Sequence, residues 1–190
     1  ALTINFGIPP LLFVQVLYGH FFYTSSVILA VPWILVIPIL ILAYYAAYVF
    51  TKNMERYRLV SRIGLIISSI FLLYIAFMFV NNSTLSVRPE RWNLYFLDPA
   101  GNNFNWGEPT LWPRFLHFIF AAIAIGALGR AVFYRFSNID EKDKSFQVER
   151  NLKIFGWITL LQFVIGTWFW LSMPGPVWRQ FMGENLAGTI

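Results

Sequence analysis

The stretch that decides the fold is GIPPLLFVQVLYGHFFYTSSVILAVPWILVIPILILAYYAAYVF, residues Gly7–Phe50, which contains no Asp, Glu, Lys or Arg. As one helix it would extend roughly 66 Å, about twice the thickness of the hydrocarbon core of a bilayer. The run must therefore fold back once. Pro32, beside Trp33, is the expected turn because proline disfavours helix at the residue before it. The stretch predicts two transmembrane helices, at 9–29 and 33–50.

The remainder of the chain repeats this pattern of apolar runs separated by polar segments. Apolar runs at 63–80, 111–133 and 152–173 predict three further membrane-spanning helices. The polar, turn-rich segment 81–110 forms a long loop, and the tail 174–190 is either a surface helix or the start of a further, truncated span. The sequence therefore predicts an all-α integral membrane protein, a single-domain bundle of about five transmembrane helices.

The composition points to the same class of protein. The chain is 58% hydrophobic and 12% charged, with a mean hydropathy of +0.60, whereas soluble domains are about 25% charged. The net charge of +5 does not indicate nucleic-acid binding, because the basic residues lie in short loops and form no patterned face. The absence of cysteine excludes disulfides, thiolate metal sites and covalent haem attachment.

The distribution of basic residues predicts the orientation in the membrane. The loops at 52–62 and 135–153 contain most of the Lys and Arg, whereas charges in 81–110 roughly balance. With five spans, the two basic loops lie on one side, which the positive-inside rule assigns to the cytoplasm. We therefore expect a cytoplasmic N-terminus, an outer loop at 81–110 and a bacterial inner membrane as the location.

The two histidines of the chain, His20 and His117, both lie inside predicted spans. Ionisable residues at membrane depth are costly and are functional candidates by default. His20 lies about nine residues, and His117 about six, from the outer end of its span, so their depths differ by roughly 5 Å. Two imidazoles at similar depth on different helices are what a haem with two axial histidines requires, and His20 and His117 are the candidate ligands of its iron.

Neighbouring residues suit a haem as well. Gly19 would let a flat macrocycle approach the backbone. Arg114, one turn before His117, is placed to pair with a haem propionate. Other interpretations remain: only one histidine holds a tetrapyrrole, or both are packing residues or parts of a proton relay. Hydrogen-bond partners for His20 would then be Tyr18, Tyr23 or Thr24.

The segments LYGHFFY around His20 and WPRFLHF around His117 resemble those of membrane-embedded b-type cytochrome subunits of respiratory chains. The pair of histidines on one helix that is typical of bc-type cytochromes is absent, so one haem b is the ceiling. The resemblance implies a subunit of a quinone-dependent oxidoreductase complex. Such a subunit would transfer electrons between a membrane quinone and other membrane or periplasmic redox subunits.

The outer loop contains the candidate residues for a quinone site. A carboxylate near the membrane surface can take the proton that a quinol releases. The same residues are also explained by an ordinary solvated loop held by salt bridges, and the run NNST at Asn81–Thr84 is interpreted as a cap where the third span ends. The candidates are Arg88, Glu90, Arg91 and Asp98, with Trp92 and Tyr95 as ring contacts.

Polar and small residues within the spans have structural interpretations. Gln15 and Gln162 predict interhelical hydrogen bonds, and Gly126 and Gly129 predict close helix packing. Two other functions stay open: a pigment-binding or accessory subunit of a photosynthetic complex, with histidine on chlorophyll magnesium, and a cofactor-free structural subunit or small transporter. An absorption spectrum distinguishes these functions from a cytochrome.

Overall fold

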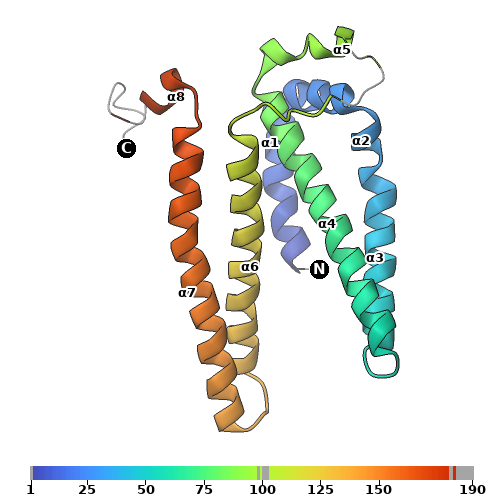
Figure 1. Cartoon of the computed structure of the whole chain (residues 1–190), viewed down its shortest axis with the longest axis vertical. Helices are drawn as coiled ribbons and strands as arrows, with labels where there is room; N and C mark the ends of the chain where they lie inside the picture. The colour runs from blue at the N-terminus through green and yellow to red at the C-terminus, as the bar shows by residue number, and fades with distance from the viewer. Residues whose placement is uncertain (1, 98, 100–102, 180–181, 183–190) are drawn as a thin grey trace. The chain divides into compact units, whose positions relative to one another are not determined.

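The computed structural model describes residues 2–97, 99, 103–179 and 182, and this part of the chain is helical without strands (Figure 1). Within these described residues, five helices are long and apolar enough to cross a membrane, which confirms the predicted all-α membrane fold. By its internal contacts the chain divides into two compact units, Ala1–Glu108 and Pro109–Ile190, and the single domain stays a prediction.

The first unit begins with two apolar helices that reverse direction at Ala30. Ala30 has φ 37° and ψ −98°, a backbone conformation that is strained for a residue with a side chain. Pro32 follows in the first turn of the next helix, where its missing N–H is not needed, so the chain turns close to the predicted position. The elements of this unit are α1 (Leu2–Leu29), α2 (Val31–Ile34), α3 (Val36–Asn53), α4 (Arg58–Ser86), the 3₁₀ turn η1 (Pro89–Arg91) and α5 (Leu94–Leu97).

Helix α1 is bent at Tyr18, whose φ of −128° and ψ of 22° are not helical. The part after Tyr18 runs at a steep angle to the part before it (Figure 1). His20 therefore lies just beyond a bend and not inside a straight span at 9–29. The depth calculated for His20 from a straight helix is wrong for this reason.

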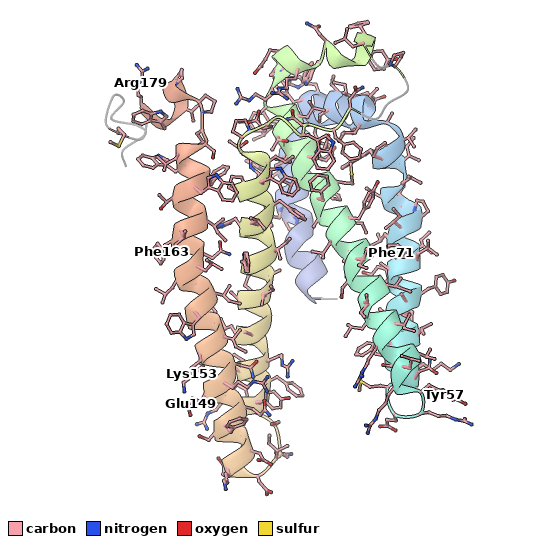
Figure 2. All side chains as sticks on the ribbon, in the orientation of Figure 1. Tyr57, Phe71, Glu149, Lys153, Phe163 and Arg179 are labelled. Atoms are coloured by element: carbon pink, nitrogen blue, oxygen red, sulfur yellow. The ribbon has the colours of Figure 1, made fainter. Side chains whose placement is uncertain are left out.

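Helices α3 and α4 form a hairpin held by small residues. A Cβ added to Gly64 would lie 2.8 Å from the carbonyl oxygen of Ala46, so the two backbones meet where only glycine fits. The Ser61 hydroxyl donates to the carbonyl of Phe50 at 3.0 Å. Such small residues let membrane helices approach closely. Figure 2 shows Tyr57 at the tip of this hairpin.

The other end of the α3–α4 hairpin contains the apolar core of the first unit. The Tyr74 hydroxyl donates to the carbonyl of Pro32 at 2.9 Å, which ties α4 to the chain reversal. The core packs the last turn of α1 against α3 and the last third of α4. Its buried members are Ile28, Leu29, Val36, Met78 and Leu85.

The second unit is a hairpin of two long helices, α6 (Leu111–Arg135) and α7 (Glu141–Leu171), followed by the short α8 (Gly175–Arg179). Helix α7 begins well before the predicted span at 152–173, because acidic residues in its first turn and ion pairs along it favour helix outside the apolar run. Glu149 and Lys153 lie one turn apart with 2.6 Å between Oε1 and Nζ (Figure 2). Alanines of α6 are buried at helical spacing: Ala124, Ala127 and Ala131.

Candidate functional site

His117 lies in the N-terminal half of α6 and lines an open groove of about 470 Å³ on the second unit. Its side chain is exposed and makes no hydrogen bond with any residue that the structure describes. Every other lining residue comes from α7, so the groove follows one face of that helix beside the imidazole. These residues are Thr159, Gln162, Phe163, Gly166, Thr167 and Trp170.

The groove combines apolar walls with few available polar atoms. A Cβ added to Gly166 would meet nothing within 4 Å, so the space beside this turn of α7 is open. The hydroxyls of Thr159 and Thr167 donate to carbonyls of their own helix, at 2.7 and 2.8 Å. A flat, largely apolar ligand would find aromatic contacts here and few competing polar groups.

Gln162 connects the two helices directly at the level of His117. Its Nε2 donates to the carbonyl oxygen of His117 at 2.9 Å, which confirms the predicted interhelical hydrogen bond. Its Oε1 is buried and has no hydrogen-bond partner in the described structure. The other predicted glutamine, Gln15, is exposed and forms no hydrogen bond with the described residues.

Arg114, the predicted propionate partner, lies one turn before His117 on α6. Its guanidinium lies over the ring of Phe169 on α7, with Cζ 5.2 Å from the ring centroid. This is a cation–π contact between α6 and α7, and Arg114 and His117, three residues apart, lie on neighbouring positions of the α6 surface. The second unit therefore brings the predicted residues Arg114 and His117 onto one face.

His20 belongs to the first unit and lies just after the bend in α1. It is exposed, and its ring centroid lies 4.0 Å from that of Phe21. The Thr24 hydroxyl donates at 2.7 Å to the backbone carbonyl of His20 and not to its ring. The imidazole has no hydrogen-bond partner among the described residues. Beside it, a Cβ on Gly19 would meet nothing within 4 Å. The haem contact predicted at Gly19 and the pairing of His20 with His117 both stay predictions.

The predicted quinone residues Arg88 and Glu90 take part in ion pairs in the outer loop. The Nε and Nη2 atoms of Arg88 each lie 3.1 Å from one oxygen of Glu108, whose side chain is 3% exposed. This hydrogen-bonded contact raises the pKa of Arg88 above its ordinary value. Glu90 is more exposed and lies 3.4 Å from Nη1 of Arg88. Asp98 lies outside the described residues.

Arg91 holds the same loop through Asn105. Its Nη1 donates to Oδ1 of Asn105 at 2.7 Å, and its Nη2 donates to the carbonyl of Gly107 at 3.3 Å. The backbone N–H of Asn105 donates to Oδ1 of Asn81 at 3.1 Å, and its Nδ2 donates to Thr84 Oγ1 at 3.3 Å. These side chains, with Arg88 and Glu108, are the outer polar network, which fastens the loop to α4.

The outer polar network contains residues that sequence reasoning missed or misread. The prediction that NNST caps the third span is wrong: α4 continues to Ser86, and Asn81 and Thr84 are fully buried within it. Asn105 and Glu108 were not predicted. Asn82 is fully buried as well, and neither Oδ1 nor Nδ2 has a partner in the described structure. The sequence signal for this buried network was the unbroken polar run NNST, which directly follows the apolar part of α4.

The predicted ring contacts Trp92 and Tyr95 lie together in a second groove, of about 410 Å³, between α1 and the η1–α5 segment. The Trp92 indole donates to the carbonyl of Leu85 at 3.1 Å, which fixes its ring. Phe21, next to His20, lies 5.8 Å from Trp92 between ring centroids. Aromatic rings therefore connect the surroundings of His20 with this groove.

The described residues contain no cluster of three or more His, Cys, Asp or Glu side chains that could hold a metal ion. A haem iron with two axial histidines needs no such cluster. Searches with protein-family models, curated proteins and solved structures found no match to the chain.

Proposed function

We propose that the protein is a membrane electron-transfer subunit that binds one b-type haem through His20 and His117. It would pass electrons between a membrane quinone and a partner redox protein. The observation that supports this proposal best is that both imidazoles are exposed on apolar helices and have no hydrogen-bond partner among the described residues. An imidazole without a hydrogen-bond partner among apolar side chains is costly, and coordination to iron would satisfy it.

The surroundings of the two histidines fit a haem. The groove at His117 has aromatic walls and an open side at Gly166, and Gly19 leaves room beside His20. His20 and His117 would hold the iron, and Arg114 would pair with a propionate. The haem would supply one-electron redox chemistry, whereas the protein would tune it by burial, hydrogen bonding and charge.

Arg88 and Arg91 are already bonded within the outer polar network, which leaves them less suited to hold a quinone. We therefore place the quinone ring in the groove beside Trp92 and Tyr95. The exposed carboxylate of Glu90 is the favoured proton acceptor among the described candidates. In the topology predicted from the charge distribution, this groove faces the periplasmic side of a bacterial inner membrane, where a periplasmic redox subunit would meet the protein.

The test is a reduced-minus-oxidised absorption spectrum of the protein purified with its partners, before and after His20→Ala and His117→Ala. We expect an α-band typical of b-type haem that either substitution abolishes. Tyr48→Ala, at an exposed position of α3, is the matched control and should keep the band. A chlorophyll-like band would indicate a pigment-binding subunit. Absence of any band would overturn the proposal in favour of a structural subunit.

A further inference from the structure

The side-chain amide of Gln162 is fixed in one orientation by its bond across the hairpin. A backbone carbonyl can only accept a hydrogen bond, so the group that faces the carbonyl of His117 at 2.9 Å must be the NH₂ of Gln162. The amide oxygen, Oε1, therefore points away from that carbonyl. It is buried and has no partner in the described structure.

A buried acceptor without a donor is unfavourable, and the groove contains few groups that can satisfy it. The hydroxyls of Thr159 and Thr167 already donate within α7. The imidazole of His117 lines the same groove and has no hydrogen bond to the described residues. A neutral imidazole has one N–H donor and one nitrogen with a free lone pair, so His117 and Gln162 are chemically complementary.

We propose that Gln162 is a positioning residue for His117: its Oε1 accepts the ring N–H, which fixes the tautomer and directs the other nitrogen into the groove as a ligand. Histidines that bind metals commonly donate their second ring N–H in this way, and the acceptor fixes the ring and increases its basicity. The part of this inference that concerns the iron rests on the proposed function, whereas the Gln162–His117 hydrogen bond does not.

The hydrogen bond from the His117 ring to Gln162 would change the reduction potential of a haem held by His117. A ring that donates its N–H to a buried acceptor gives more electron density to iron and stabilises the oxidised state. Removal of Oε1 should therefore raise the midpoint potential of the haem and change its low-spin electron paramagnetic resonance spectrum. Loss of helix packing alone would lower haem content without a systematic shift in potential.

The first experiment does not need haem. Only two histidines occur in the chain, so ¹⁵N-histidine labelling of the His20→Ala protein leaves the ring nitrogens of His117 alone in the nuclear magnetic resonance spectrum. We expect Gln162→Leu and Gln162→Asn to shift these resonances, because the first removes the oxygen and the second withdraws it by one methylene. Gln162→Glu should restore them when its carboxyl is protonated, because that group donates and accepts as the amide does.

The matched control is Ser172→Ala, which alters a residue at the end of α7 whose hydroxyl is likewise bonded to a carbonyl of α7 and which does not line the groove. It should leave the His117 resonances and the haem potential unchanged. Unchanged resonances in both Gln162→Leu and Gln162→Asn would overturn the inference, even if the wild type shows the haem band and the proposed function stands. A wild type without that band would remove the proposed function, and the resonances would still decide the Gln162–His117 bond.

Discussion

The guanidinium of Arg88 contacts both carboxylate oxygens of the buried Glu108, with Nε 3.1 Å from Oε2 and Nη2 3.1 Å from Oε1. Arg88 lies two residues after the end of α4 at Ser86, and Glu108 is the last residue of the first unit. A two-point contact of this kind fixes direction as well as distance. It therefore closes the outer loop of the first unit, together with the bond between Arg91 and Asn105.

Replacing Arg88 should destabilise the outer loop. Arg88→Met removes the two guanidinium donors that contact a carboxylate that is 3% exposed, and breaking a buried pair costs about 3–5 kcal/mol. The change is measured as thermal unfolding in detergent by tryptophan fluorescence. Glu90→Gln is the control, because Glu90 is mostly exposed and such pairs contribute at most about 1 kcal/mol. Equal losses from both substitutions would contradict the assignment.

Adjacent asparagines of α4 should respond in opposite ways to the same substitution. Asn82→Leu replaces a buried amide without described partners by an apolar group with the same number of side-chain heavy atoms, and should raise stability by about 1–3 kcal/mol. Asn81→Leu removes the acceptor for the Asn105 N–H and should lower it. Unfolding curves of both variants test this. A loss in Asn82→Leu equal to that in Asn81→Leu would show that Asn82 has a polar partner in the assembled protein.

The close approach of α3 and α4 predicts a position-specific effect of glycine substitution. Gly64→Ala places a Cβ 2.8 Å from the Ala46 oxygen, and overpacking of this kind costs about 1–3 kcal/mol. Gly126→Ala on α6 is the control, since its Cβ would meet nothing within 4 Å and alanine is the better helix former. Stability measured by thermal unfolding should fall only for Gly64→Ala. A similar fall for both would show that Gly126 is packed against a partner.

The predicted orientation can be tested with single cysteines, because the chain has none of its own. Cysteines at Arg56 and Lys142, which are exposed in the two basic loops, should react with a membrane-impermeant maleimide only in inverted vesicles. A cysteine at Asn93, exposed in the outer loop, should react only in right-side-out vesicles. The reverse pattern would place the N-terminus outside and overturn the positive-inside assignment.

The sequence predicted the helices of this fold because lipid leaves few alternatives to helical backbone. The turn between the first two spans was predicted close to its position from Pro32, but the break lies at Ala30, and Val31 and Pro32 begin α2. Helix ends were less predictable. The length of an apolar run reflects the thickness of the bilayer and not the full length of the helix. Both α4 and α7 continue beyond their apolar runs into polar sequence. The bend at Tyr18 has no proline in the turns next to it, so the sequence pattern did not reveal it.

The candidate site was predictable only for residues whose chemistry is unusual at membrane depth. His20, His117 and Gln162 are polar residues within apolar runs, and each was predicted from that fact alone. The roles of Arg88 and Arg91 were not predictable, because their partners Glu108 and Asn105 lie 20 and 14 residues away along the chain. Spacing in sequence does not reveal which side chains a returning loop brings together.

Helix α7 has a mechanical consequence. Its 31 residues, Glu141–Leu171, extend roughly 46 Å against a hydrocarbon core of about 30 Å. The helix contains no proline, so its charged first turns continue as one rod into the apolar part that includes Gln162. A protein bound to the exposed end of α7 near Glu149 would be able to tilt the whole helix. Because no proline-induced hinge intervenes, such a tilt would displace the contact between Gln162 and the His117 carbonyl.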